Sequence, residues 1–378
     1  MPKLLILTDW YSPGFLAGGP IQSCINLANA LKDKFDINIL TTDTDFQQIK
    51  SYPNIVPNEW IIDEGLKIYY AKKKSLPKLF PSKFLKLEFD VVYLNNMYSW
   101  HFTLLPLLLK RMNLTHKANF ILAPRGMLSE GSIQVKKIKK LVFLKTVKML
   151  GIYDNITFHA TSEDEKRNIL TYFPEAIVKT ISNLSSQSDT INNTTKKEND
   201  LKLICVSRTS PEKNIYFLIE LLTKLPIDYS LSLDIYGLIN DKEYFKKCKE
   251  LEHKLPKGIQ VNYCKPLPHT ELLKKFNSYH FFISPSKGEN FGHAIAEALS
   301  AGMPVIISDR TPWRNLKVMD VGWDISLERP DEFLKILNFV YAMDNVTYQN
   351  MKIAAIEFYS RKTDNKENIN SYVQLFTI

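Results

Sequence analysis

Short apolar runs alternate along most of the chain with longer segments whose apolar residues recur at helical spacing. Residues 3–8 form the first run, and Ile21, Cys24, Ala28 and Leu31 then recur three or four positions apart. Such runs are typical of buried strands, and such recurrence is typical of helices that cover a sheet. The pattern predicts an α/β protein with mostly parallel sheets. Further strands are predicted at residues 37–41, 89–95, 119–123, 156–160, 201–206, 230–237, 260–264, 281–283 and 305–308.

The pattern is interrupted over residues 185–200, where SSQSDTINNTTKKEND contains Ile191 as its one apolar residue. The length of 378 residues is also long for a single core, since domains usually span about 100–200 residues. We therefore predict a first domain at residues 1–184, a polar linker at 185–200 and a second domain at 201–363.

The stretch 279–309 carries the densest group of chemically useful residues. A buried strand ends at Ser284-Pro285 and a polar loop follows. A helix is then predicted over residues 292–301, with Gly302 placed where a helix C′ residue is expected.

Two carboxylates bracket the start of this helix. Glu289 lies in the loop and Glu297 lies eight residues later, inside the helix. This separation suits an elongated polar ligand better than one metal ion. The backbone N–H groups between them lie at a helix N-terminus, where unpaired donors and the helix dipole favour an anion such as a phosphate. These groups belong to Asn290, Phe291, Gly292 and His293. The alternative is that both glutamates are ordinary solvated residues.

Two other connections between a strand and a helix carry candidate binding groups. Arg208 and Lys213 follow the strand at 201–206, close enough to bind two oxygens of one diphosphate. Taken alone, they could equally be solvated loop residues. The pair Gly18-Gly19 lets the backbone approach a ligand after the first strand. Because the pair is not a GxGxxG fingerprint, a nicotinamide cofactor is poorly supported.

The net charge of +9 is concentrated in the first half of the chain, where Met1 to Thr190 hold 24 Lys+Arg against 17 Asp+Glu. Residues 67–86 and 133–150 contain lysines and no acid. Basic patches attract nucleic acid, anionic membranes and phosphate-bearing substrates alike. Charge alone therefore names these three kinds of partner without choosing among them.

Residues 133–150 are predicted to form one helix whose faces differ. A helix with one apolar and one lysine-rich face is expected at a membrane interface, although a solvated surface helix is the alternative. The apolar face comprises Ile133, Leu141, Leu144, Val147 and Leu150, and the basic face comprises Lys136, Lys137, Lys139, Lys140 and Lys145.

Other features limit the location and the cofactors of the protein. No apolar run approaches the roughly 18 residues that span a bilayer, and the N-terminus MPKLLILTDW lacks the pattern of a signal peptide. We therefore expect a cytoplasmic protein, peripheral at the inner face of the cytoplasmic membrane. The four cysteines form no CxxC pair, which argues against a zinc site.

In combination, these motifs resemble the family-four retaining glycosyltransferases of the GT-B fold. The segment GENFGHAIAEALSAGMPVI is similar to the family's Glu-x7-Glu motif, and Arg208 and Lys213 stand in an R-x4-K loop. Together with Gly18-Gly19, the resemblance covers nearly the whole chain. It implies two Rossmann-like domains with parallel sheets facing an interdomain cleft, with residues 364–378 packing back onto the first domain.

The resemblance also implies a role for each residue. Glu297 would bind the ribose hydroxyls, and Glu289 would contact the transferred sugar near its reacting end. Arg208 and Lys213 would stabilise the diphosphate leaving group without a metal ion or another cofactor. The other donor-side positions implied are Gly18, Gly19, Asn290, Phe291, Gly292 and His293, with Pro266 and Leu267 bordering the base.

The acceptor side departs from the family pattern. Many members carry a histidine at the end of the strand that corresponds to residues 91–95, where this chain reads YLNN. Asn95 can form hydrogen bonds but cannot act as a general base, and His101 and Arg125 are further acceptor-side candidates. Retaining transfer in this family is commonly explained by front-face attack in which the departing phosphate takes the acceptor's proton. On that mechanism a protein base is dispensable.

The segments PRGMLSEGSI and TPWRNL resemble transferases of bacterial surface-polysaccharide assembly, such as capsule, O-antigen or exopolysaccharide. The implied partners are a nucleotide sugar, a glycan or lipid-linked acceptor and an anionic membrane surface, but no nucleic acid. Trp313 either lines the donor pocket or packs under the loop. The alternatives are a nucleotide-sugar epimerase or phosphorylase of the same fold, and a non-enzymatic basic module that binds membranes or nucleic acid. The second alternative leaves the ordered Gly, Arg, Lys and Glu positions unexplained.

Overall fold

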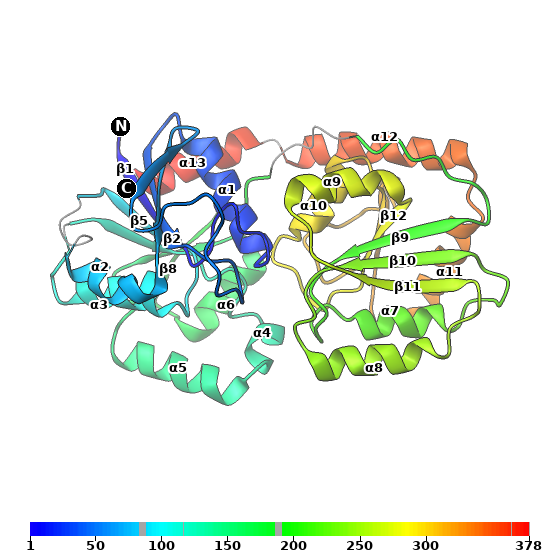
Figure 1. The fold of residues 1–378 in the computed structure, drawn as a ribbon, viewed down its shortest axis with the longest axis horizontal. Coiled ribbons are helices and arrows are strands. Elements are labelled where there is room, and N and C mark those ends of the chain that lie inside the picture. The colour runs from blue at the N-terminus through cyan, green and yellow to red at the C-terminus, as the bar shows by residue number, and fades with distance from the viewer. Residues whose placement is uncertain (83–87, 116, 186–190, 364, 378) are drawn as a thin grey trace. The chain divides into compact units, whose positions relative to one another are not determined.

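The computed structural model describes residues 1–82, 88–115, 117–185, 191–363 and 365–377. The chain divides into two compact units, of which the first comprises Met1–Ser185 with Asn365–Ile378 and the second comprises Ser186–Asp364. In each unit, helices cover both faces of a largely parallel sheet (Figure 1). The prediction of an α/β fold with parallel sheets is confirmed.

Over the described residues, the first unit holds an eight-stranded sheet in the order β3-β4-β2-β1-β5-β6-β7-β8. Neighbouring strands pair in parallel, except that β3 pairs with β4 in antiparallel fashion at one edge. Strands β3, β4 and β8 were not predicted from the sequence. The strands are β1 (Lys3–Leu7), β2 (Asp36–Thr42), β3 (Trp60–Asp63), β4 (Leu66–Ala71), β5 (Val91–Leu94), β6 (Asn119–Leu122), β7 (Thr157–Ala160) and β8 (Ile177–Thr180).

Two hydrophobic clusters fill the two faces of this sheet. Helices α1 and α13 contribute to one cluster, in which Leu27 and Tyr372 are buried. Helices α2, α3, α5 and α6 contribute to the other, around Phe102 and Phe158. The helices are α1 (Gly19–Leu31), α2 (Leu76–Ser82), α3 (Leu105–Arg111), α4 (Glu130–Gln134), α5 (Lys137–Met149), α6 (Glu163–Tyr172) and α13 (Asn365–Phe376), with a 3-10 turn at Lys73–Ser75 and a π-helical turn at Trp100–Leu104.

The second unit holds a six-stranded sheet over the residues that the structure describes, in the order β11-β10-β9-β12-β13-β14, with all neighbours parallel. The strands are β9 (Leu201–Val206), β10 (Leu231–Tyr236), β11 (Ile259–Cys264), β12 (Phe281–Ser284), β13 (Val305–Ser308) and β14 (Gly322–Ile325). The short β14 was not predicted.

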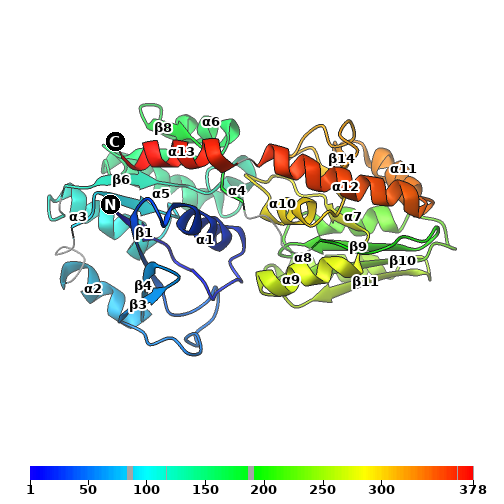
Figure 2. The ribbon, with the colours of Figure 1, turned by 90° about the horizontal axis from the view of Figure 1, so that it is seen from above.

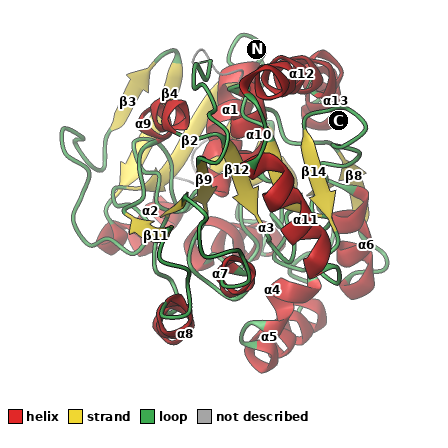
Figure 3. Ribbon diagram, turned by 90° about the vertical axis from the view of Figure 1, so that its right-hand side faces the viewer, coloured by secondary structure: helices red, strands yellow, loops and turns green. Residues whose placement is uncertain are grey.

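Helices α7, α8 and α11 pack on one face of this sheet, and α9, α10 and α12 pack on the other (Figures 1 and 3). Helix α12 runs beside α10 in the second unit (Figure 2). The helices are α7 (Ile215–Leu222), α8 (Lys242–Glu252), α9 (His269–Lys275), α10 (His293–Ser300), α11 (Pro330–Tyr341) and α12 (Asn345–Lys362), with a 3-10 turn at Phe276–Ser278.

The segment predicted as a polar linker differs from a free connection where it is described. Asn192 is buried, its amide nitrogen donates to the Tyr279 carbonyl, and its backbone N–H donates to the Ala301 carbonyl at 2.7 Å. The Lys196 ammonium donates to the carbonyl of Tyr341 at 3.1 Å. These bonds make residues 191–200 part of the second unit, so the linker prediction was wrong there; residues 186–190 lie outside the described ranges.

The helix predicted over residues 133–150 is broken in the structure. Val135 is extended and Lys136 is left-handed, with φ 60°, so α4 ends at Gln134 and α5 begins at Lys137. In residues 100–111, a π-helical turn is followed directly by α3.

Candidate active site

Three loops of the second unit start at the carboxyl ends of neighbouring strands. Strands β9, β12 and β13 are adjacent and parallel, so the segments that follow them leave the sheet at one edge, where α/β folds bind ligands. The segments are residues 207–214, 285–292 and 309–315, and we call them the three-loop site.

Backbone hydrogen bonds tie these loops together. The N–H of Lys287 donates to the Glu212 carbonyl at 2.8 Å, which joins the second loop to the first. The N–H of Glu289 donates to the Arg310 carbonyl at 3.0 Å, which joins the second loop to the third. The loop that carries Glu289 is therefore held from both sides by main-chain groups.

The predicted diphosphate cation and the predicted sugar-binding carboxylate contact one another. The Lys213 ammonium donates to Glu289 Oε1 at 2.5 Å, and both side chains are largely buried, with 20% and 17% exposed. Separate ligands were predicted for these two residues, whereas the structure places them in one ion pair. Arg208, from the same loop as Lys213, is exposed.

The N-terminus of α10 lies at the end of the second loop. Gly292 is its N-cap, has a left-handed backbone with φ 76° and provides no side-chain cap. Most residues adopt this conformation only under strain, and a Cβ at this position would lie 2.9 Å from Ile295 Cδ1. The backbone N–H groups at this helix start lie at the positive end of the helix dipole, which favours an anion. The amide nitrogen of Asn290 beside them is buried without a hydrogen-bond partner among the described residues.

The second predicted carboxylate, Glu297, faces the first residue of α9. His269 Nε2 lies 3.3 Å from Glu297 Oε1. Burial lowers the pKa of His269, but the contact with Glu297 outweighs it, and the pKa is raised above its usual value. Leu267, predicted at the base together with Pro266, packs against the same hydrophobic cluster as Ala296 of α10. Sequence reasoning missed His269, which no motif distinguishes.

In the first unit, Gly18 is the N-cap of α1 with φ 67° and without a side-chain cap. A Cβ on Gly18 would meet nothing within 4 Å, so this turn is open. Gly19 opens the helix, and its carbonyl accepts from the Ser23 hydroxyl at 2.9 Å. The glycine pair thus presents a second uncapped helix N-terminus, within the first unit.

The acceptor-side candidates Asn95 and Arg125 form one hydrogen-bonded network. Arg125 Nε donates to Asn95 Oδ1 at 2.6 Å, and its terminal nitrogens donate to the Tyr93 hydroxyl at 3.0 Å and to the Asn183 side chain. Asn95 Nδ2 in turn donates to the Pro20 carbonyl at 3.2 Å. These bonds direct the Arg125 guanidinium into the first unit and connect it, through Asn95, to the glycine turn.

Replacing Arg125 by alanine is expected to lower the free energy of unfolding by about 3 kcal/mol, because it leaves buried partners of a charged donor unpaired. Urea denaturation measures this change. The matched control is Arg111→Ala, which removes one bond to the Gly151 carbonyl at the surface and should cost under about 1 kcal/mol. Equal stability of the two variants would show that Arg125 is free to bind a ligand.

The remaining acceptor candidate, His101, lies in the π-helical turn, and burial lowers its pKa. A residue that the sequence analysis missed lies closer to the strand ends. Asp9 follows β1, and its carboxylate accepts from the Asn96 amide at 2.9 Å and the Ser99 hydroxyl at 2.8 Å. Burial raises the pKa of Asp9. Its position as an acidic residue just after the first buried strand is the sequence signal that could have identified Asp9.

The described part of the chain adds no other candidate centre. A cavity of about 1010 Å³ opens at the amino edge of the first sheet, around Asp90 and Asn119, and contains none of the predicted site residues. Within the same described ranges, no group of three or more histidine, cysteine, aspartate or glutamate side chains could hold a metal ion.

The fold places the chain in the GT-B class, with two Rossmann-like units built on parallel sheets. The structure is similar over its whole length to sucrose-phosphate synthase from Thermosynechococcus elongatus, with TM-score 0.72, 15% identity and coverage of 98% of that chain. It is similar to HepE from Anabaena, solved with UDP and glucose, with TM-score 0.67, 15% identity and full coverage of both chains. At such identities the likeness establishes the fold alone.

Residues 186–357 match the family model of the glycosyl transferases group 1. The match lies within the second unit and covers less than half of the chain. A stretch of 133 residues is 29% identical to the GtfA subunit of the UDP-N-acetylglucosamine–peptide N-acetylglucosaminyltransferase of Streptococcus agalactiae, covering 34% of this chain and 25% of that protein. Another stretch, of 159 residues, is 26% identical to the GDP-Man:Man(3)GlcNAc(2)-PP-Dol alpha-1,2-mannosyltransferase of Caenorhabditis elegans, covering 40% of this chain and 33% of that protein. The matches thus span a quarter to a third of these relatives.

Proposed function

We propose that this protein is a retaining, metal-independent glycosyltransferase. It moves a sugar from a nucleoside-diphosphate sugar to a glycan or lipid-linked acceptor in the assembly of a bacterial surface polysaccharide. The observation that carries the proposal is the Lys213–Glu289 pair in the three-loop site, which lies in the unit that matches the family. Similar proteins support a nucleotide-sugar donor, since HepE was also solved with UDP-glucose.

The proposed reaction needs stabilisation of a departing diphosphate. The bond between the sugar's anomeric carbon and the phosphate oxygen breaks, and a bond to the acceptor oxygen forms on the same face. The acceptor's proton passes to the departing phosphate. Lys213, Arg208 and the positive end of the α10 dipole supply fixed positive charge where negative charge develops, which is usually the largest single contribution to lowering such a barrier.

The two glutamates divide the rest of the donor between them. Glu289 is held by Lys213 next to the diphosphate position, where it contacts the transferred sugar near its reacting end. Glu297, further along α10, accepts hydrogen bonds from the ribose hydroxyls. The Pro266-Leu267 segment borders the base.

A binding screen tests this proposal directly. UDP, GDP, ADP, CDP and TDP are added separately in the presence of EDTA, and the midpoint of thermal unfolding is measured. One of them should stabilise the protein by about 2.7 kcal/mol when present at about 100 times its Kd. The matching nucleotide sugar should then be consumed when acceptor extract is added.

Other outcomes of the screen favour the alternatives. Release of a free epimerised sugar, or of a sugar phosphate in the presence of inorganic phosphate, would identify an epimerase or a phosphorylase. Failure of every nucleotide to bind, combined with salt-sensitive binding of nucleic acid, would identify a non-enzymatic module.

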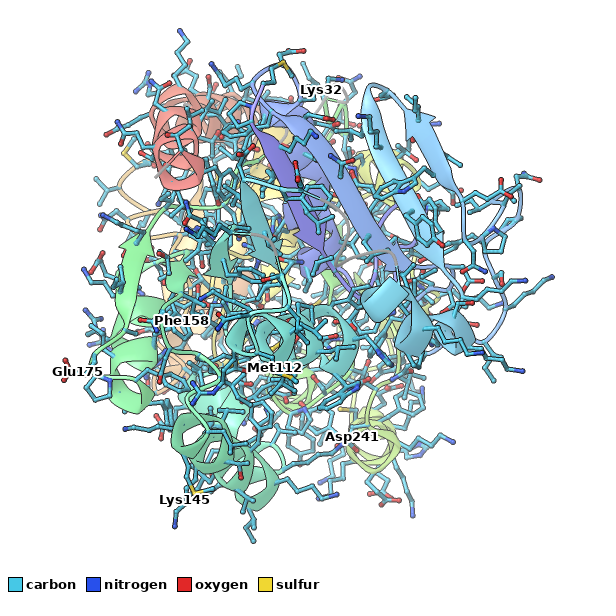
Figure 4. The ribbon with its side chains drawn as sticks, turned by 90° about the vertical axis from the view of Figure 1, so that its left-hand side faces the viewer. Lys32, Met112, Lys145, Phe158, Glu175 and Asp241 are labelled. Atoms are coloured by element: carbon cyan, nitrogen blue, oxygen red, sulfur yellow. The ribbon has the colours of Figure 1, made fainter. Side chains whose placement is uncertain are left out.

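The proposed acceptor lies at a membrane, and α5 is the surface that supports this. Ile138, Val142 and Met149 of α5 are 78%, 61% and 76% exposed. Exposed lysines stand between them, and Lys145 lies on the outer side of α5 (Figure 4). Apolar side chains among lysines fit an anionic bilayer surface. Within the described ranges, no helix is long and apolar enough to cross a membrane.

Only part of the apolar face predicted for residues 133–150 is exposed. Of the five apolar residues predicted to share one face, Ile133, Leu144 and Val147 are buried in the core of the first unit. Leu141 and Leu150 are 40% and 46% exposed. The apolar part of the proposed docking surface therefore comprises Val135, Ile138, Leu141, Val142, Met149 and Leu150.

A further inference from the structure

Trp313, in the third loop of the three-loop site, is joined to the second loop by a side-chain hydrogen bond. Its indole N–H donates to the Phe291 carbonyl at 2.6 Å. The side chain is buried, with 2% exposed, between Phe291 on one side and the α12 residues Phe358 and Tyr359 on the other. Because aromatic side chains pack on both sides of it, the indole ring is held in a fixed orientation.

The bond fixes the plane of the peptide unit between Phe291 and Gly292. A peptide unit is planar and trans, so its carbonyl and its N–H point in opposite directions. Because Trp313 holds the Phe291 carbonyl on the buried side, the Gly292 N–H points away from the indole, at the N-terminus of α10. Gly292 is partly exposed, and its left-handed backbone, with φ 76°, accommodates this peptide orientation.

Other groups near this N–H indicate an anionic ligand. The Lys213 ammonium lies against Glu289, three residues before Gly292. The amide nitrogen of Asn290 is buried and has no hydrogen-bond partner within the described residues. A cation from the first loop and an unpaired amide and an uncapped helix start from the second thus meet in the three-loop site.

We infer that Trp313 is a positioning residue for the donor, which aims the Gly292 N–H at the terminal phosphate of the nucleoside diphosphate. The inference rests on the proposed function and deepens it. Without the indole N–H, the Phe291 carbonyl loses its partner and the peptide plane can rotate. The N–H then no longer points at the ligand.

The test uses the full-length protein and calorimetric binding of nucleotides. The diphosphate that binds most tightly among UDP, GDP, ADP, CDP and TDP is compared with its monophosphate. Loss of one aligned hydrogen bond to a charged group should reduce the diphosphate-to-monophosphate affinity ratio about 10-fold in Trp313→Phe. Affinity for the monophosphate should change less than about 2-fold, because the base and ribose contacts are made by other residues.

Two further variants separate positioning from packing. Incorporation of benzothienylalanine at position 313 keeps the ring shape and replaces the N–H by sulfur, so the fold is retained and the affinity ratio should still fall. Phe358→Leu loosens the packing under Trp313 but leaves its N–H, so the ratio should stay unchanged although the Tm falls.

The possible results distinguish a failure of the inference from a failure of the proposed function. A normal ratio in the benzothienylalanine protein, or an equal loss in Phe358→Leu, would overturn the inference while leaving the proposed function intact. Absence of nucleotide binding by the unmodified protein would overturn the proposed function itself, and the inference with it.

Discussion

Replacing Lys213 by alanine is expected to lower kcat for sugar transfer by about 10²–10³-fold, as does removal of a single oxyanion-stabilising donor elsewhere. Lys213 is the cation nearest to Glu289 in the three-loop site, and its charge opposes the charge that develops on the departing diphosphate. Glu289→Ala should cause a loss of similar size, because the carboxylate both contacts the sugar and holds Lys213. Steady-state transfer of a radiolabelled sugar to acceptor extract measures both.

The fold should survive these changes, since the loops are held by main-chain bonds. Circular dichroism and the Tm of both variants are expected to remain close to the parent values. Lys224→Ala, at an exposed position beyond the end of α7, is the matched control and should transfer sugar normally. Normal turnover by both site variants would remove the proposed site.

Neutralising four exposed lysines around α5 is expected to weaken binding to anionic vesicles by about 10²–10³-fold, since each lysine near such a surface contributes about 1 kcal/mol. The changes are Lys136→Gln, Lys137→Gln, Lys139→Gln and Lys145→Gln. Lys140 is left in place because its ammonium donates to the Ser132 carbonyl and supports the junction between α4 and α5. Co-sedimentation with equal parts of phosphatidylglycerol and phosphatidylcholine measures the affinity.

The control for this experiment removes the same charge from another surface. Lys242, Lys246, Lys247 and Lys254, on or just after α8, are exposed, and their replacement by glutamine should leave vesicle binding unchanged. If both quadruple variants lose binding equally, net charge alone attracts the protein. If neither loses it, α5 is not the docking surface. A further loss in Ile138→Ser combined with Val142→Ser would show that apolar side chains enter the interface.

The sequence predicted most of the central strands, because buried parallel strands are continuous apolar runs. It missed β3, whose residues are largely exposed, and β14, which is four residues long. Neither has the apolar run that marks a buried strand. The break between α4 and α5 was missed because it depends on Lys136 adopting a left-handed backbone. No glycine or proline stands at this position to indicate a helix end.

Some parts of the candidate site were predicted from the sequence in more detail than others. The spacing of Glu289 and Glu297 identified the loop and helix of the second unit. The contact of Lys213 with Glu289 and that of His269 with Glu297 could not be foreseen, since they depend on side-chain packing between segments distant in sequence. Arg125 follows β6, and the direction of its side chain depends on Asn183 and Tyr93.

Main-chain hydrogen bonds join the loops of the three-loop site to one another. The Glu212 and Arg310 carbonyls accept from the N–H groups of Lys287 and Glu289, and none of these four groups depends on residue identity, apart from the exclusion of proline. Side chains that project from the loops can therefore be exchanged while the loops keep their course. Such a scaffold is suited to donor-preference engineering, in which the residues that contact the base and the sugar are varied and the main chain is left untouched.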